Sequence, residues 1–215
     1  PYGSSLNGTE DSVAALTVDD LRAAKDRVLA RDRVLVAAAG DITPGELGAL
    51  MDRVLGDLPA TATAPLPQAA ELKLTGGTTV VDWDSPQTVV AFAQEGLAMD
   101  DPDYFAAFVL NHILGGGGFS SRLMDEIREK RGLTYGVYSG FSAMQARGPF
   151  MINLQTRADL SEGTLALVKQ LLADYLRDGP TQQELDNAKR ELAGSFPLST
   201  ASNAAIVGQL ASMGF

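Results

Sequence analysis

An arginine and a tyrosine that can act together on a carbonyl group stand seven residues apart in the run "REKRGLTY". Arg128 carries a permanent, forked positive charge, which can bind a carbonyl or a carboxylate oxygen. Tyr135 offers a phenol hydroxyl, which can donate a hydrogen bond to an oxyanion. Arg128 falls near the end of a predicted helix and Tyr135 early in a predicted strand. The tight "KRGL" connection between them can bring both side chains to one surface.

Each of these side chains also has a purely structural interpretation. Arg128 can be a solvated residue that favours the C-terminal end of a helix dipole, and Tyr135 can be a half-buried strand aromatic. Arg131 is a rival for the arginine role, with a spacing of four residues to Tyr135. Tyr138 has the opposite strand parity, which predicts a packing or surface position. The residues alone leave these alternatives open.

Four consecutive glycines and a phenylalanine follow a predicted helix: Gly115, Gly116, Gly117, Gly118 and Phe119. A phosphate-binding loop needs a strand before the glycines and Lys-Ser/Thr after them, and this run has neither. One glycine is enough for a turn between helices, and each further one costs roughly 1 kcal/mol relative to alanine. The run therefore predicts a hinge, or a loop that another backbone approaches closely.

The histidine and cysteine counts limit the metal chemistry of this chain. His112 is the single histidine and there is no cysteine, whereas a catalytic zinc site usually takes three protein ligands. We therefore expect no metal site within the chain, and His112 is predicted to be structural or solvent-facing. The formal charge of −10 argues against nucleic acid as a partner, because phosphate binding needs a surplus of Lys and Arg.

Apolar periodicity predicts an α+β fold, with a mainly antiparallel sheet and helices packed on one face. Capping-box spacings, Thr17 with Asp20 and Thr43 with Glu46, mark the starts of two helices. Strands are predicted at 33–41, 78–83, 88–93, 133–144 and 150–156, with a hairpin at "QARG". Helices are predicted at 16–32, 43–56, 101–115, 120–130, 160–178, 182–195 and 200–213.

Two segments carry a resemblance to a known family. "LNHILGGGGFSSRLMDEIREKRGLTYGVYS" resembles the second-domain signature of the pitrilysin/insulinase family of zinc metallopeptidases, which includes mitochondrial processing peptidase. "VAAAGDITPGELGALMDRVLGDLP" resembles the segment that closes the preceding domain of that family. The match runs over most of the chain.

The resemblance implies a clamshell of paired α+β domains around an enclosed chamber. One half of such a clamshell carries the zinc motif His-x-x-Glu-His, and the other half supplies an Arg and, seven residues later, a Tyr. Arg128 and Tyr135 match that pair, whereas no His-x-x-Glu-His occurs here. The chain therefore resembles the non-zinc half, which is not active alone, and zinc is expected in a partner domain or subunit. Gly115–Gly118 and Phe119 are expected to line the chamber and contact unfolded peptide substrates.

The resemblance also suggests an organisation into parts. Residues 1–58 are predicted to close a preceding family domain, 59–70 to form a linker, and 71–215 to form a second domain that is truncated at its C-terminus. Such a fragment is expected to pair with a zinc-bearing half in cis or in trans, or to form a homodimer. A bacterial compartment, periplasm in preference to cytoplasm, is implied. The alternative function is a non-catalytic scaffold or binding domain of the same family.

Overall fold

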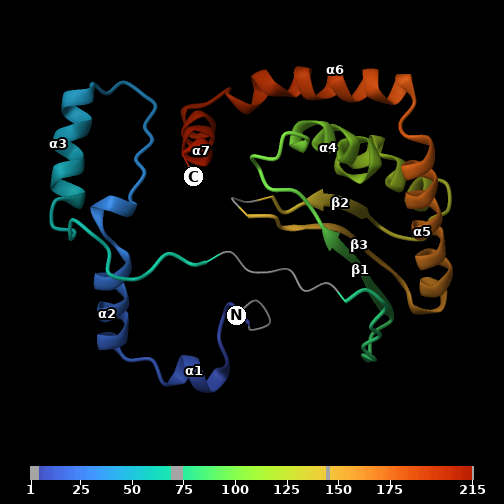
Figure 1. Ribbon diagram of the computed structural model, residues 1–215, viewed down its shortest axis with the longest axis horizontal. Coiled ribbons are helices and arrows are strands. Elements are labelled where there is room, and N and C mark those ends of the chain that lie inside the picture. Colours follow the sequence, from blue (N-terminus) through green and yellow to red (C-terminus); the bar gives the residue numbers. More distant parts are fainter. Residues whose placement is uncertain (1–4, 69–74, 144–145, 215) are drawn as a thin grey trace. The chain divides into compact units, whose positions relative to one another are not determined.

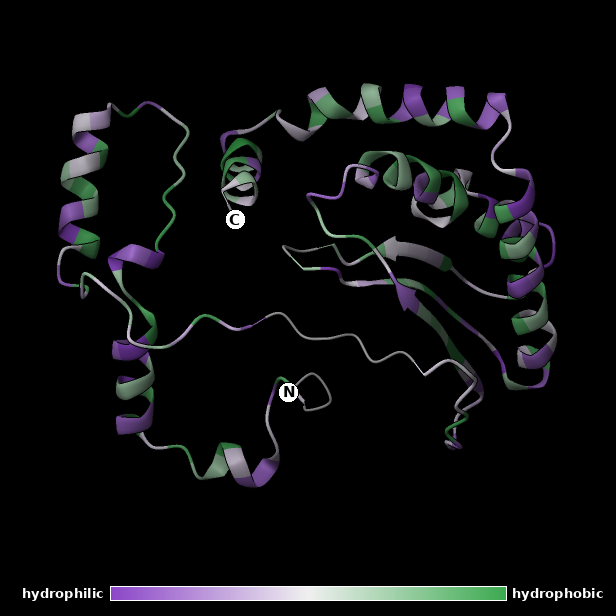
Figure 2. Cartoon of the chain, viewed as in Figure 1, coloured by the Kyte–Doolittle hydropathy of each residue, from purple (hydrophilic) through white to green (hydrophobic). Residues whose placement is uncertain are grey.

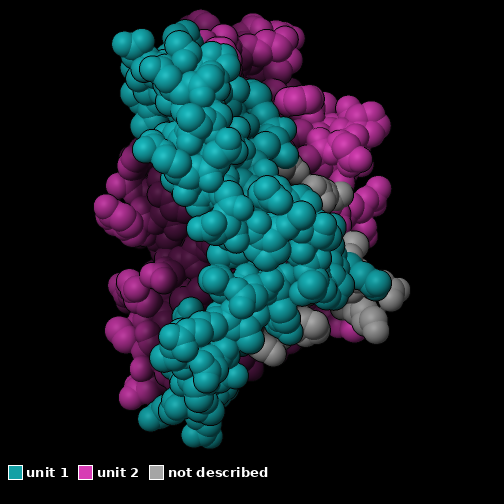
Figure 3. Space-filling model, turned by 90° about the vertical axis from the view of Figure 1, so that its left-hand side faces the viewer, with its two compact units in different colours: residues 1–68, 197–215 teal, residues 69–196 magenta. Residues whose placement is uncertain are grey.

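The computed structural model describes residues 5–68, 75–143 and 146–214 of the chain. These residues form two compact units, one built from 1–68 together with 197–215 and the other from 69–196 (Figure 3). The end of the predicted linker, 69–70, the last residue of the strand predicted at 133–144 and the first residue of the predicted hairpin, 145, lie outside the described residues. No helix in the described part of the chain is long and apolar enough to cross a lipid bilayer.

The unit of residues 69–196 is built on a three-stranded antiparallel sheet with the order β1-β3-β2 (Figure 1). Its strands are β1 (Gln87–Glu95), β2 (Val137–Phe141) and β3 (Pro149–Arg157). The central strand β3 pairs with both neighbours, so that Leu154 lies opposite Val90 on β1 and Val137 on β2. The predicted α+β class is thus confirmed, as are the strands expected at 88–93 and 150–156.

One face of this sheet is covered by helices, and the core lies between the two layers. The helices that contact the strands are α4 (Tyr104–Asn111) and α5 (Ser161–Asp178), while α6 (Gln182–Ser199) contributes Ala188 to the core. Along α5 and α6, hydrophilic and hydrophobic residues alternate, as expected for helices with one face on a core (Figure 2). Inward residues of β3 join apolar residues of the helical segments in a single cluster: Ile113, Leu114, Leu123, Met124, Ile127, Val137, Phe150, Ile152, Leu154, Val168, Tyr175 and Ala188.

Four short irregular helices complete this layer. Two are π-helical, η2 (His112–Gly116) and η4 (Met124–Glu129), and two are 3₁₀ turns, η3 (Gly118–Ser120) and η5 (Ala158–Leu160). The predicted helices at 101–115 and 120–130 therefore exist, but each widens into a π-helical turn. Such turns occur frequently at functional sites.

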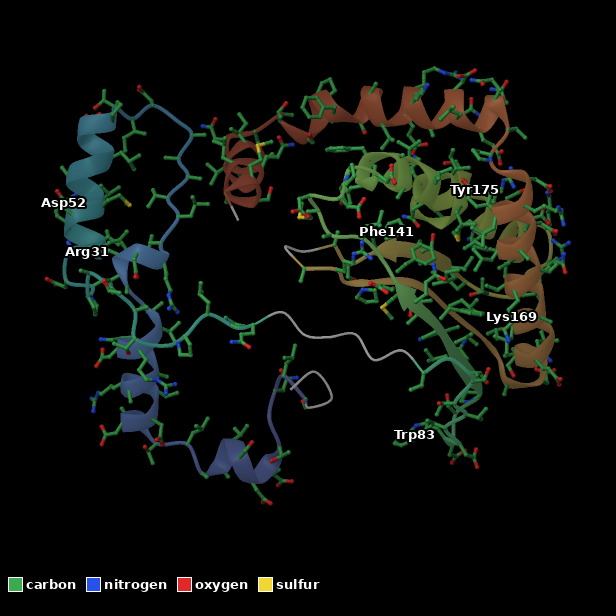
Figure 4. All side chains as sticks on the ribbon, in the orientation of Figure 1. Arg31, Asp52, Trp83, Phe141, Lys169 and Tyr175 are labelled. Atoms are coloured by element: carbon green, nitrogen blue, oxygen red, sulfur yellow. The ribbon has the colours of Figure 1, made fainter. Side chains whose placement is uncertain are left out.

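Arg122 stabilises the connection between α5 and α6 through hydrogen bonds to both sides of it. Its guanidinium donates to both carboxylate oxygens of Glu184 and to the carbonyl of Gly179, the latter at 3.1 Å. Gly179 has a φ of +70°, which ends α5 at the predicted residue. The Tyr175 ring lies 4.8 Å from the Arg122 Cζ, and its hydroxyl donates to the Leu110 carbonyl at 2.9 Å (Figure 4). Burial raises the pKa of Tyr175 to about 12.

The unit of residues 1–68 and 197–215 is helical. It contains α1 (Glu10–Ala14), α2 (Val18–Val28), the 3₁₀ turn η1 (Arg31–Arg33), α3 (Pro44–Leu55) and α7 (Asn203–Met213). Both predicted capping boxes are present, at Thr17 for α2 and at Thr43 for α3. These starts were predictable because the interactions that make them span only three residues.

Two predicted strands are wrong. Residues 34–39 and 78–83 belong to no helix or strand. Val80 is 86% exposed and Trp83 is 81% exposed, and Figure 4 labels Trp83 on this segment. Valine, threonine and tryptophan favour extended backbone locally. A strand also needs a hydrogen-bonded neighbour, and neither segment has one among the described residues.

The charge on Glu184 makes the stability of this fold depend on pH. The Arg122 side chain and the Thr181 backbone and hydroxyl donate to Glu184 and lower its pKa from 4.5 to about 2. A lowered folded-state pKa stabilises the fold above the unfolded value, and this stability is lost as pH falls from about 4.5 to about 2. Urea unfolding should therefore show that Glu184→Gln destabilises the chain by about 1–3 kcal/mol at pH 7. The difference should shrink at pH 3.

Glu162→Gln provides the control, because Glu162 is an exposed residue of the first turn of α5. Its effect at pH 7 should stay below about 1 kcal/mol. An equal loss for Glu184→Gln at both pH values would show that the Glu184 charge does not stabilise the corner.

Candidate functional site

Arg128, Tyr135 and Phe119 converge from three consecutive elements of the chain. Arg128 belongs to η4, Phe119 to the 3₁₀ turn η3, and Tyr135 to the connection that leads into β2. The Arg128 Cζ lies 4.7 Å from the centroid of the Phe119 ring and 5.7 Å from that of the Tyr135 ring. Both distances fall within the range of cation–π attraction. The structure thus brings together Arg128 and Tyr135, the pair implied by the family resemblance, and adds the phenylalanine of the glycine run.

The two aromatic rings of this cluster are open to solvent. Tyr135 is 91% and Phe119 67% exposed, whereas the Arg128 side chain is 28% exposed. The prediction that Tyr135 lies early in a strand is wrong, because β2 begins only at Val137, which is fully buried. Exposed aromatic side chains beside a cation are typical of binding surfaces.

Arg128 is positioned by the way its helix ends. Ile127, the preceding residue, is completely buried and anchors the segment. The backbone N–H of Lys130 donates to the Asp125 carbonyl at 2.9 Å, a π-type bond that widens the turn. Gly132, with φ +61°, then reverses the chain, and its N–H donates to the Arg128 carbonyl at 2.8 Å. A residue with a Cβ is strained at this φ.

Tyr135 is positioned by hydrogen bonds to the central strand. The Thr134 hydroxyl donates to the Gln155 carbonyl at 2.6 Å, and the Thr156 hydroxyl donates to the Leu133 carbonyl, also at 2.6 Å. Thr156 is buried, so this second bond forms away from water. The backbone around Tyr135 is therefore held against β3, although its side chain is exposed.

The neighbouring cations differ from Arg128 in their partners. Lys130 and Arg131 both form 2.5 Å ion pairs with Glu126, and these two side chains lower the pKa of its carboxyl group. In the described part of the chain Arg128 has one ion-pair partner, the adjacent Glu129. Arg131, the rival for the arginine role, is thus committed to Glu126, and Arg128 is the arginine that lies beside Tyr135.

The glycine run divides into a packed part and an open part. Gly115 is buried, so a direct contact of this residue with a substrate is not available. Gly118 is the residue with a left-handed φ, +59°, and it has open space around its Cβ position. A Cβ would lie 2.5 Å from Ser139 Oγ at Gly115, 2.6 Å from Asn111 Nδ2 at Gly116, and 2.7 Å from the His112 carbonyl oxygen at Gly117. The first three glycines are thus required by close packing, and the fourth by the turn.

His112 is the first residue of η2, the π-helical turn that contains Gly115 and Gly116. Its side chain is 14% exposed. Its Nε2 is 3.4 Å from Glu191 Oε2, without the alignment of a hydrogen bond, and has no hydrogen-bond partner. A small surface pocket is lined by His112 and Glu191 together with Ser120 and Ala188. No group of three or more His, Cys, Asp or Glu residues suited to a metal ion occurs among the described residues.

Sequence reasoning missed the contact between Phe119 and Arg128 and the π-helical turns that position it. The available signal was a lone aromatic residue directly after four glycines. That pattern indicates an aromatic side chain on an open turn but not its neighbour, which is nine residues away. The π-helical turns have no signature of their own in the sequence.

Comparisons with known proteins agree with the geometry. A family model described as the peptidase M16 inactive domain matches residues 15–192. The chain is 32% identical over 205 residues to the "non-peptidase homolog YmxG" of Helicobacter pylori, which covers 92% of this chain and 46% of that protein. It is 30% identical over 197 residues to the "uncharacterized zinc protease YmxG" of Bacillus subtilis, which covers 92% of this chain and 47% of that protein.

Solved structures extend the likeness to three dimensions. The crystal structure of a peptidase M16 inactive domain from Pseudomonas fluorescens matches with a TM-score of 0.87 and 53% identity, over 100% of this chain and 51% of that chain. A protease from Helicobacter pylori matches with a TM-score of 0.81 over 95% of this chain and 51% of that chain, and at 24% identity it shows the fold alone. The chain spans about half the length of the curated relatives it matches.

The packing of Gly115 makes a testable prediction. A Cβ at this position would lie 2.9 Å from a Leu123 methyl group and 3.0 Å from the Ser139 backbone nitrogen. Gly115→Ala should therefore destabilise the chain by about 1–3 kcal/mol in urea unfolding, as overpacking does. Gly163→Ala is the matched control on α5, where nothing lies within 4 Å of the Cβ position. It should be neutral or stabilising by up to about 1 kcal/mol. Equal effects of the two substitutions would refute the packing role.

Proposed function

Since the chain belongs to the peptidase M16 inactive-domain family, we propose that it forms the non-zinc half of a zinc-dependent endopeptidase. In this role it binds peptide substrates and assists in stabilising the transition state. The observation that carries the proposal is the meeting of Arg128 and Tyr135 on one solvent-exposed surface. A purely structural pair would be expected to bury the tyrosine ring, which is instead 91% exposed.

The two side chains take complementary parts on a peptide group. Tyr135 donates its hydroxyl to the carbonyl oxygen as negative charge develops there. Arg128 donates from its guanidinium to a neighbouring carbonyl of the bound peptide and so fixes the register of the chain. Gly118, the open residue of the glycine run, borders this surface and contacts the peptide, and Phe119 lies beside it against Arg128.

The zinc ion comes from a partner half, joined in cis or supplied in trans. With His112 as the single histidine and no cysteine, these residues do not fit the three-ligand site that catalytic zinc requires. The described residues likewise provide no cluster of potential ligands. Unfolded peptides are the expected substrates, because the family resemblance implies an enclosed chamber. A homodimer of the chain is a further arrangement that the proposal allows.

A second candidate function is that of a non-catalytic scaffold or binding domain. The relative of Helicobacter pylori that is 32% identical to this chain is named a non-peptidase homolog. In that case the exposed pair would bind peptide segments without contributing to cleavage.

Peptide cleavage by the assembled complex of this chain with a zinc-bearing half separates the two functions. Tyr135→Phe should lower kcat by about 10²–10³, the usual effect of losing one oxyanion donor. Arg128→Ala should lower kcat/KM by about 10- to 100-fold, as expected for a charge-assisted hydrogen bond. Size-exclusion chromatography should show that both variants still assemble.

The matched controls are Tyr138→Phe and Arg157→Ala. Tyr138 is 53% exposed on β2, and Arg157 is an exposed residue at the end of β3 that pairs with Asp159. Both controls should cleave at wild-type rates. Cleavage that is indifferent to Arg128→Ala and Tyr135→Phe would leave the scaffold as the function of this domain.

A further inference from the structure

Phe119 is an exposed aromatic residue with a specific neighbour. Its ring is 67% exposed, yet it lies 4.7 Å from the Arg128 Cζ, closer than the Tyr135 ring at 5.7 Å. An exposed phenylalanine gains little from burial of its own surface. Its contact with a guanidinium, by contrast, contributes about 0.5–1 kcal/mol at an exposed site and more when water is excluded.

The turn that carries Phe119 is held in place at both ends. The N–H of Gly117 donates to the His112 carbonyl at 2.8 Å. The Ser120 hydroxyl lies 2.9 Å from the Gly117 carbonyl oxygen and 3.2 Å from Glu191 Oε2 on α6. Ser121, which is completely buried, donates its hydroxyl to the Gly118 carbonyl at 2.7 Å. The ring is therefore presented by a braced turn, and not by a freely moving loop.

Arg128 needs such a neighbour. An arginine side chain has about 2 kcal/mol of rotamer entropy to lose when it is fixed. Its single ion-pair partner in the described part of the chain, Glu129, is the adjacent residue and is 50% exposed. An exposed pair of this kind contributes little to orientation. A ring, unlike a carboxylate, offers no strong hydrogen-bond acceptor, so it restrains the guanidinium without occupying its N–H donors.

We propose that Phe119 is a positioning residue, which holds the guanidinium of Arg128 beside Tyr135 so that both donors meet the same peptide segment. This inference rests on the proposed function, because the position matters only if Arg128 binds substrate. It assigns the glycine run a definite purpose. Gly115–Gly117 allow close packing, Gly118 makes the turn, and the turn places one aromatic ring against the arginine.

Three variants of the full 215-residue chain test the inference. Phe119→Leu removes the ring and keeps an apolar side chain, Phe119→Trp restores an aromatic face, and Phe105→Leu is the control. Phe105 is 77% exposed on α4, and its ring packs on that of Tyr104 at 5.6 Å. Because Phe105 and Phe119 are both exposed, their replacement by leucine should change the free energy of unfolding little, by less than about 1 kcal/mol.

The first readout is the NMR signal of the Arg128 Nε–Hε group, assigned by its loss in Arg128→Lys. Stacking on a ring shifts this signal upfield. Phe119→Leu should move it toward the position of a free arginine, Phe119→Trp should keep the upfield shift, and Phe105→Leu should leave the signal unchanged. This measurement needs neither zinc nor a substrate, so it tests the contact separately from the proposed function.

The second readout is peptide cleavage by the complex with a zinc-bearing half. Phe119→Leu should lower kcat/KM by about 10-fold, close to the value of a well-shielded cation–π contact. Phe119→Trp should recover most of this loss, which a general disturbance of the fold would not allow. In the Arg128→Ala background, Phe119→Leu should have no further effect, because its influence passes through the arginine.

The outcomes are distinguishable. A wild-type Arg128 signal in Phe119→Leu overturns the positioning role, whatever the activity. A full additional loss in the Arg128→Ala background also overturns it, because Phe119 would then act on substrate directly. If the signal moves but cleavage is indifferent to Arg128→Ala, the proposed function fails and the catalytic purpose of Phe119 fails with it. A moved signal, an activity loss rescued by tryptophan and non-additivity with Arg128 together support the inference.

Discussion

The chain reversal at Gly132 is the constraint on which the candidate site depends. On one side of it, Ile127 is completely buried and fixes the position of the adjacent Arg128; on the other, Val137 is completely buried and fixes the start of β2. The chain must turn back between these two anchors within a few residues, and a φ of +61° makes that turn without strain only for glycine. The positions of Arg128 and Tyr135 relative to each other are thus set by Ile127, by Val137 and by the turn at Gly132. The candidate pair lies outside the core, but its geometry is set by core residues.

Among the described residues around the reversal, Arg128 differs from the neighbouring cations in the groups that surround it. Arg122 is bound by Glu184 and a backbone carbonyl, while Lys130 and Arg131 share Glu126. Each of these carboxylates neutralises its cation. Arg128 also pairs with a carboxylate, that of the adjacent and half-exposed Glu129, but its guanidinium lies in addition within cation–π distance of two aromatic rings, which attract its charge without cancelling it. In a chain with a formal charge of −10, an arginine restrained in this way keeps donors available for a bound carbonyl group.

The features that could be predicted from the sequence are those set by local interactions. The capping boxes at Thr17 and Thr43 and the end of α5 at Gly179 follow from residues within a few positions of each other. The strands β1 and β3 were predicted from local apolar periodicity, and they form because each finds a partner strand. The wrong strand predictions concern segments whose structure depends on a partner far away in the sequence. Residues 34–39 and 78–83 have strand composition, but a strand forms only when another part of the chain supplies hydrogen bonds. The same limit hid the contact of Phe119 with Arg128, because nothing near Phe119 in the sequence identifies the side chain that its ring meets.

The exposure of Tyr135 bears on why this domain would need a partner to act. A hydroxyl that is almost fully in water stabilises a developing oxyanion only weakly, because water competes for the same oxygen and screens the charge. The same hydroxyl becomes effective once the site is closed and water is excluded. On the proposed function, the second half of the enzyme therefore does more than supply zinc, since it also covers the surface on which Arg128 and Tyr135 meet. The turn that carries Phe119 and the reversal at Gly132 already hold Arg128 and Tyr135 in position. On the proposed function, binding of the second half then has only to exclude water and supply the zinc. On that proposal, this division accounts for a domain that holds Arg128 and Tyr135 in a defined position while leaving Tyr135 open to solvent.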